Sequence, residues 1–168
     1  LQDYPIKSTD EGRAMLQIVH DVAPGAELYF RTGFLTAGDF ATGIKDLSNN
    51  GCNVIVDDLT YLTEPFLQDG VVAKAVNAAK TLGVTYFSSA GNFANKSYEK
   101  NFTPVDASSI GFIGKTAHDF SGTGDIFQHI TLPPGNYTIV LQWVDNIYSS
   151  GQIQGTNYDL DMFWTSNT

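Results

Sequence analysis

The segment Tyr86-Phe87-Ser88-Ser89-Ala90-Gly91-Asn92 joins an apolar β pattern to a tight turn of small residues that ends at an amide side chain. A second apolar β pattern, Cys52-Asn53-Val54-Ile55-Val56-Asp57, lies upstream of it. Between the two, residues 71–82 have the apolar spacing of a helix, which stops at Gly83. A strand, a helix and a second strand in this order predict two parallel strands joined by a crossover helix.

The residues before this unit continue the same alternation. Met15, Leu16, Val19 and Val22 follow Asp10 at helical spacing. We then expect a strand over residues 27–31 and a helix over residues 39–47, which stops at Asn49-Asn50-Gly51. Residues 1–103 are therefore predicted to form an α/β domain, a parallel sheet with flanking helices.

The pattern changes after about residue 101, where the helical period disappears. Short strand patterns occupy residues 116–120, 125–132, 137–144 and 159–164, and turns rich in glycine, proline and polar residues separate them. Residues 104–168 are therefore predicted to form a small all-β module, a sandwich or jelly roll.

The bulk composition excludes some classes of function. The net charge of −9 is spread along the chain, whereas a nucleic-acid-binding protein is expected to carry a basic surface. No stretch approaches the 18 consecutive apolar residues of a membrane span. Cys52 is the only cysteine, so an internal disulfide is ruled out, and its strand pattern favours a small buried apolar residue over a reactive thiol.

Four ordered segments resemble the middle of a serine peptidase of the subtilisin/sedolisin clan. They are Asp10-Glu11-Gly12-Arg13-Ala14-Met15, Val22-Ala23-Pro24-Gly25-Ala26-Glu27-Leu28-Tyr29, the run from Cys52 to Val56, and Ser89-Ala90-Gly91-Asn92. In that clan a helix begins at a catalytic residue and ends in the Ala-Pro-Gly-Ala turn, and a later strand ends at an oxyanion-hole asparagine. The resemblance covers roughly residues 8–100. It implies a subtilisin-like α/β fold and a secreted, bacterial peptidase acting on peptides or proteins. The β module resembles, more loosely, the β-sandwich domains that accompany such enzymes.

Asn92 is the candidate oxyanion donor. Acyl-transfer enzymes need a hydrogen-bond donor aimed at the oxygen that becomes negative in the transition state, and a side-chain amide on a rigid strand end supplies one. Ser89, Ala90 and Gly91 are small enough for a substrate backbone to approach. The structural alternative is an asparagine that simply serves the turn.

Glu11 stands where the resemblance places the general base. Subtilisins have a histidine there, in a His-Gly-Thr motif, and this chain has Glu11-Gly12-Arg13. Sedolisins use a glutamate assisted by an aspartate one helical turn later, but this chain has Met15 at that position. The alternative is a helix N-terminal acid that complements the helix dipole. His20 lies ~13 Å further along the same helix and is interpreted as a structural or surface residue.

Asp57 and Asp58 end a buried strand beside the expected substrate-binding edge. Adjacent side chains on a strand point to opposite faces, so one of the two at most faces a given site. Either is a candidate substrate-binding residue, and Glu64 and Asp69 in the following loop belong to the same group. The alternative is a pair of carboxylates that begin a loop.

The β module carries one candidate metal site. Asp145, Asn146, Asp159 and Asp161 could converge on Ca²⁺, which prefers six to eight oxygen ligands, or serve as hydrogen-bonded turn residues. No other cofactor is expected.

No candidate nucleophile follows the oxyanion motif. The two Gly-Thr pairs, at 122–123 and 155–156, are not followed by the serine that such a peptidase requires. The 168-residue chain alone is therefore expected not to hydrolyse peptides. The alternative function is a non-catalytic binding protein whose β module recognises carbohydrate or protein through Trp143, Tyr148, Tyr158 and Trp164. A flavodoxin-like cofactor protein would need a glycine-rich phosphate loop, which the sequence lacks.

Overall fold

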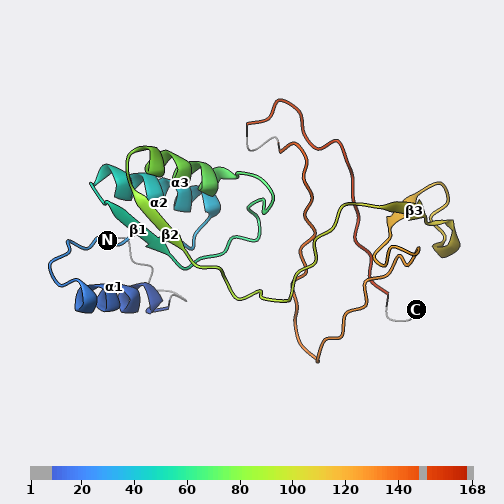
Figure 1. Cartoon of the computed structure of the whole chain (residues 1–168), viewed down its shortest axis with the longest axis horizontal. Helices are drawn as coiled ribbons and strands as arrows, with labels where there is room; N and C mark the ends of the chain where they lie inside the picture. The colour runs from blue at the N-terminus through green and yellow to red at the C-terminus, as the bar shows by residue number, and fades with distance from the viewer. Residues whose placement is uncertain (1–8, 148–150, 166–168) are drawn as a thin grey trace. The chain divides into compact units, whose positions relative to one another are not determined.

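A computed structural model describes residues 9–147 and 151–165. The chain divides into two compact units, one comprising residues 1–91 together with 140–168 and the other Asn92–Ile139. The whole is a mixed α/β protein (Figure 1). None of the helices in the described ranges has the length and apolar character needed to cross a membrane. The predicted domain boundary between residues 103 and 104 stays a prediction.

The first unit contains the predicted parallel pair of strands. Strands β1 (Val54–Asp57) and β2 (Thr85–Ser88) run parallel, with Val54 opposite Thr85 and Asp57 opposite Ser88. Helix α3 (Val71–Thr81) makes the crossover between them, and α2 (Ala37–Asn49) packs beside α3 on the same face of the sheet (Figure 1). Helix α1 (Glu11–Val22) precedes them. The predicted strand–helix–strand order is confirmed.

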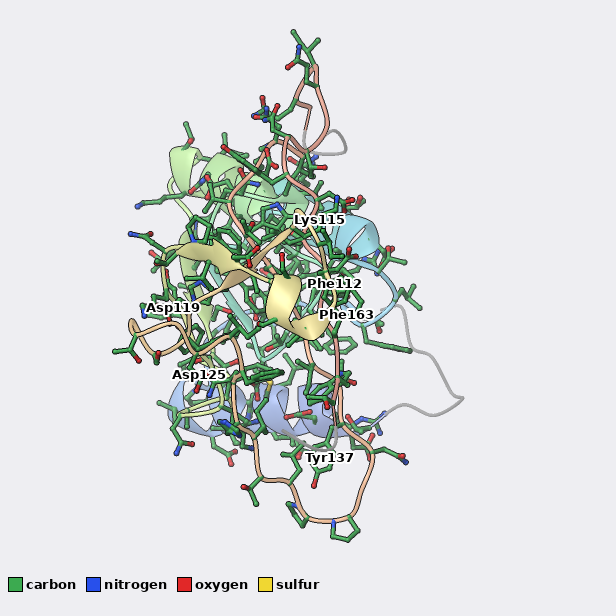
Figure 2. All side chains as sticks on the ribbon, turned by 90° about the vertical axis from the view of Figure 1, so that its right-hand side faces the viewer. Phe112, Lys115, Asp119, Asp125, Tyr137 and Phe163 are labelled. Carbon is green, nitrogen blue, oxygen red and sulfur yellow. The ribbon has the colours of Figure 1, made fainter. Side chains whose placement is uncertain are left out.

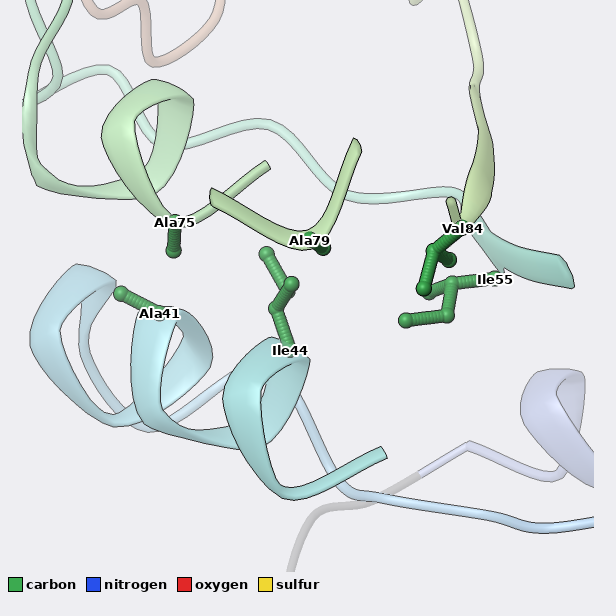
Figure 3. Packing of buried hydrophobic residues seen from close by; sticks show 6 residues of the cluster. All are labelled: Ala41, Ile44, Ile55, Ala75, Ala79 and Val84. Carbon is green, nitrogen blue, oxygen red and sulfur yellow. The ribbon is translucent and has the colours of Figure 1, made fainter. Parts of the chain in front are cut away.

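The core of this unit lies between the two helices and the sheet. Alanines on the facing sides of α2 and α3 leave little side-chain bulk between the helices, and the most buried residue is Ile44, which is 1% exposed. Strand β1 contributes Ile55 from the same face of the sheet. Figure 3 shows the cluster, which comprises Ala41, Ile44, Ile55, Ala75, Ala79 and Val84.

The strand predicted over residues 27–31 is absent from the structure, so this prediction is wrong. No described strand pairs with this segment, and its last residue, Arg31, contacts α2 through its side chain instead. Arg31 donates from Nη2 to Asp39 Oδ1 at 2.8 Å and from Nη1 to the Thr32 carbonyl at 3.0 Å. The segment therefore contacts α2 through the Arg31 side chain and is not a member of the sheet.

The second unit is built on a short antiparallel pair. Strand β3 (Pro104–Asp106) pairs with β4 (Thr116–His118), and the single-turn 3₁₀ helix η1 (Ser108–Ile110) lies between them. The His118 ring contacts a group of aromatic rings. Its Nδ1 accepts the Thr103 amide N–H at 3.1 Å, which makes Nε2 the protonated nitrogen of the neutral ring, beside the Tyr98 hydroxyl.

Asp119 fixes the turn that follows β4. The residue is labelled in Figure 2 and is almost fully buried. Burial by itself raises its pKa. Amide N–H groups of Gly122, Gly124 and Ser121, with the Ser121 hydroxyl, outweigh that effect and hold the pKa below its ordinary value. The Ser-Gly-Thr-Gly segment is thus a turn organised around one carboxylate.

The predicted β-sandwich is not found in the described residues. The first of its four predicted strands, 116–120, is present as β4, but residues 125–132, 137–144 and 159–164 form no strand in the described ranges. An alternating sequence becomes a strand only when a neighbour accepts its backbone hydrogen bonds. In the first unit, the Gln142 side chain instead forms hydrogen bonds with the backbone of the loop at residues 62–66.

Candidate functional site

The carboxyl ends of β1 and β2 open into a cleft of about 410 Å³. Its walls are the two strand ends, the loop from Leu59 to Asp69, the first turns of α3 and one residue of α2, all within the first unit. Phe40, Val72 and Val76 are among its apolar lining residues. The lining side chains that carry hydrogen-bonding groups are Asp57, Thr60, Tyr61, Glu64, Asp69, Asn77, Tyr86 and Ser88.

Asp57 is held in place by two side chains of β2 and by the loop that follows β1. Its Oδ2 accepts the Tyr86 hydroxyl at 2.5 Å, and its Oδ1 accepts the Ser88 hydroxyl at 2.9 Å. The Leu59 amide also donates to Oδ1, at 3.3 Å. The register explains these contacts, because Asp57 lies opposite Ser88 and alternation puts Tyr86 on the same face of the sheet.

Two tyrosine hydroxyls of the cleft remain protonated donors. Burial, together with the hydrogen bond to Asp57 and its negative charge, raises the pKa of Tyr86 far above its ordinary value. Burial, and then the charge of Asp39, raises the pKa of Tyr61, whose hydroxyl donates to the Gly33 carbonyl. Neither side chain is suited to act as a base near neutral pH.

The other two predicted carboxylates of this group also line the cleft. Glu64 Oε2 accepts the Val72 amide at 2.9 Å, in the first turn of α3, where amides have no partner within the helix. Gly70 lies so close that a Cβ there would stand 2.4 Å from Glu64 Oε2. Asp69 Oδ2 accepts the Asn77 side-chain amide at 2.8 Å. The fold therefore brings Asp57, Glu64 and Asp69 to one cleft.

Asp58 does not join them. It is exposed and is not among the residues that line the cleft. This matches the expectation that at most one of two adjacent strand residues faces a site.

Gln142 holds the loop wall of the cleft from outside. Its Nε2 donates to the carbonyls of Leu62 and Glu64, at 3.1 and 2.9 Å, and its Oε1 accepts the Phe66 amide at 2.8 Å. Gln68 adds a bond to the Asp145 carbonyl at 2.7 Å. Sequence reasoning missed Gln142, although a lone amide between Leu141 and Trp143 in an apolar run is the kind of signal that marks a polar anchor.

The turn predicted to contact the substrate backbone leaves the sheet at the same edge. The Ser89 amide donates to the Asp57 carbonyl at 3.3 Å, which extends the pairing of the two strands by one residue. Ser89, Ala90 and Gly91 are exposed, and Gly91 has a φ of +73°, a left-handed conformation that glycine adopts without strain.

The two predicted catalytic residues belong to different units. Glu11 is the exposed first residue of α1, and Asn92 is the first residue of the second unit, also exposed. Their approach to a common site stays a prediction. His20 is exposed near the end of α1, beside Asp21.

Asp145 acts as a turn carboxylate. Burial raises its pKa, but donors from Tyr158, Asn146 and Asn157 outweigh it and lower the pKa overall. In the described ranges no three acidic, histidine or cysteine side chains gather as metal ligands, and Asp159 and Asp161 are exposed. N–H groups already occupy the Asp145 oxygens, so its geometry does not favour a cation, and the calcium site stays a prediction.

The predicted aromatic contact residues differ in their surroundings. Tyr158 and Trp164 are 66% and 62% exposed, whereas Trp143 is half-buried and its indole nitrogen has no partner among the described groups. Tyr148 lies outside the described residues.

No family model, no curated protein and no solved structure matches the chain.

Proposed function

We propose that this chain supplies the substrate-binding part of a secreted serine-type endopeptidase of the subtilisin/sedolisin type. Glu11 takes the position of the catalytic histidine, Asn92 donates to the oxyanion, and Asp57 with Ser89–Gly91 lines the substrate site. The nucleophile lies outside residues 1–168, because no serine here stands in the required motif. A β-sandwich completed by further strands belongs to the same proposal.

The observation that supports this proposal is the common edge of β1 and β2. Asp57 lies opposite Ser88, and the Ser89 amide donates to the Asp57 carbonyl. The Asp57 carboxylate at the end of β1 and the small-residue turn after β2 are therefore neighbours at the same edge of the sheet. Open α/β sheets bind their ligands outside the carboxyl ends of their strands. A 410 Å³ cleft opens at this edge, which is a common size for a ligand site.

The chemistry assigned to this edge is acyl transfer. A nucleophile attacks the scissile carbonyl, a base at the Glu11 position takes the proton of the nucleophile, and the Asn92 amide donates to the carbonyl oxygen as it becomes negative. The carbonyl re-forms as the peptide C–N bond breaks, the protonated base gives its proton to the leaving amine, and water then hydrolyses the acyl-enzyme. The exposed turn of Ser89, Ala90 and Gly91 lets the substrate backbone approach that donor.

The experiment uses the natural polypeptide that contains this sequence. A fluorophosphonate should label a serine outside residues 1–168, and labelling should abolish cleavage of an unfolded protein substrate. Asn92→Ala should lower kcat by about 10²–10³ with a smaller change in KM, because its bond forms mainly in the transition state. Asn95→Ala, in the same exposed turn region, is the matched control and should leave kcat unchanged.

Residues 1–168 alone should cleave nothing above background. Absence of labelling and cleavage in the natural polypeptide would overturn the peptidase proposal. Cleavage by the 168-residue chain that a fluorophosphonate abolishes would show instead that the nucleophile lies within it.

The exposure of Tyr158 and Trp164 favours one alternative, a non-catalytic protein that binds carbohydrate or protein through these aromatic faces. Tyr158→Ala and Trp164→Ala would then abolish ligand capture, whereas the peptidase proposal expects both variants to retain full peptide cleavage.

A further inference from the structure

The cleft beside β1 carries negative charge without a basic residue in its lining. Asp57, Glu64 and Asp69 contribute carboxylates, and no lysine, arginine or histidine is among its described lining residues. The ion pairs recorded in the described ranges involve other carboxylates, of which the most buried is the pair of Arg31 with Asp39. The charge of the cleft therefore complements a cation.

Asp57 has a free acceptor position and a fixed orientation. A carboxylate offers about four lone-pair positions, and the hydroxyls of Tyr86 and Ser88 with the Leu59 amide take three of them. These neutral donors hold the side chain without neutralising it. A ligand cation would thus bind a carboxylate whose orientation is already fixed, so that binding does not cost the conformational entropy of this side chain.

The remaining walls suit a hydrocarbon stem. Phe40, Val72 and Val76 supply apolar surface in the same cleft as Asp57. Lysine and arginine pack their methylene stems on apolar surface while their charged ends reach polar groups. An acidic side chain would be repelled here, and a neutral apolar one would desolvate Asp57 without offering it a partner.

We propose that this cleft takes a lysine or arginine side chain of a polypeptide, with Asp57 as its ion-pair partner and Glu64 and Asp69 adding attraction. The identity of the ligand as a polypeptide rests on the proposed peptidase function. Gln142 is a positioning residue, because its three bonds to the backbone of the loop hold the outer wall in place. The inference adds a preference for basic residues to the substrate site.

Binding to the purified chain tests this without any catalytic step. Three capped, fluorescent peptides of equal length carry lysine, norleucine or glutamate at one central position, and anisotropy gives each Kd. Norleucine keeps an unbranched apolar stem but has no charge. The lysine peptide should bind at least about tenfold more tightly than the norleucine peptide, as expected for a hydrogen bond to a charged group. The glutamate peptide should bind most weakly.

Variants locate the preference. Asp57→Asn should remove most of the advantage of lysine over norleucine, whereas Asp58→Asn, next to it but outside the cleft lining, should keep it. Gln142→Leu should weaken the binding of the lysine and norleucine peptides by similar factors, because it loosens the loop wall of the cleft but leaves the negative charge of Asp57 in place. Equal binding of lysine and norleucine peptides by the unaltered chain, equal effects of the two aspartate variants, or no binding of any peptide would overturn the inference.

A measurement on the unaltered chain guards against a variant that fails to fold. In ¹⁵N spectra, the lysine peptide should shift the amide signals of Asp57, Ser88 and Val72 more than the norleucine peptide does. Shifts confined to other regions would overturn the inference. Loss of fluorophosphonate labelling would count against the peptidase proposal and leave a measured lysine preference standing, so the two failures are distinguishable.

Discussion

Replacing Tyr86 with phenylalanine removes a single hydroxyl group and keeps the ring in the core. That hydroxyl donates to Asp57 at 2.5 Å and is one of the three donors that hold the carboxylate in the cleft. In the variant, the Asp57 carboxylate keeps the Ser88 hydroxyl and the Leu59 amide as hydrogen-bond donors, so it is held less firmly but not left without partners.

The expected cost follows from the kind of bond that is lost. Hydrogen bonds to charged groups contribute about 1.5–3 kcal/mol. The cleft is open to water, which can replace part of the lost bond, so the lower end of this range applies. We expect Tyr86→Phe to reduce the free energy of unfolding by about 1.5 kcal/mol.

Tyr29→Phe is the matched control. Tyr29 also donates its hydroxyl to a carboxylate, that of Glu27, at 3.0 Å, but the pair is exposed. Exposed polar pairs contribute little because water competes for both partners. This variant should not change stability measurably.

Urea unfolding followed by far-ultraviolet circular dichroism measures both variants, because the α-helices of the described ranges all lie in the first unit. The sign of the pH dependence adds a second observable. The folded state holds the Tyr86 proton more tightly than the unfolded state, whose tyrosine pKa is about 10. The stabilisation from Tyr86 is therefore complete below about pH 10 and falls as the pH rises further, so the unaltered chain should lose stability above that pH more steeply than Tyr86→Phe. Equal stability of Tyr86→Phe and Tyr29→Phe would refute the role given to the Asp57–Tyr86 bond.

Two further predictions concern the scaffold. Gly38→Ala should stabilise α2 by about 0.5–1 kcal/mol in urea unfolding, because the atom nearest to the new Cβ would be 3.9 Å away. Gly43→Ala should destabilise α2, because its Cβ would stand 2.8 Å from Arg31 Cγ. A stabilising effect of Gly43→Ala would contradict this contact. Asp145 has a lowered pKa in the folded state, so the stability it provides is present above about pH 4 and lost as the pH falls below that value. Asp145→Asn should accordingly flatten the acid dependence of unfolding measured by tryptophan fluorescence, and an unchanged acid profile would count against the role of this turn.

Local patterns were enough to predict the strand–helix–strand crossover of the first unit, but not the segment at residues 27–31, where the predicted strand is absent. The helix predicted over residues 71–82 is α3 (Val71–Thr81), and the apolar β pattern predicted to end in the turn before Asn92 is β2 (Thr85–Ser88). Their ends are marked by glycine and by a change of period, which are signals within a few residues. The strands predicted over 125–132, 137–144 and 159–164 depended on partners elsewhere in the chain, and an alternating pattern does not specify a partner.

In the candidate site, too, one part could be predicted from local patterns and another part depends on contacts between distant residues. Asp57 could be placed at the sheet edge because the carboxyl ends of parallel strands meet there. The bond from Tyr86 required the register of β1 against β2, which the sequence does not give. The contacts of Gln142 with Leu62 and Glu64 join residues 80 and 78 positions apart, beyond the reach of any local rule.

The proposed peptidase site requires Glu11 and Asn92 to lie around one cleft, within roughly 10–12 Å of each other, because base and oxyanion donor must flank one carbonyl. A nitroxide on Glu11→Cys, with Cys52→Ser to leave a single thiol, tests this through its effect on nuclear magnetic resonance signals. We predict strong broadening of the Asn92 side-chain amide signals, and weaker broadening from a nitroxide on His20→Cys, ~13 Å further along α1. Asn92 signals that stay sharp with the label at position 11 would contradict the assignment of these two residues to one site.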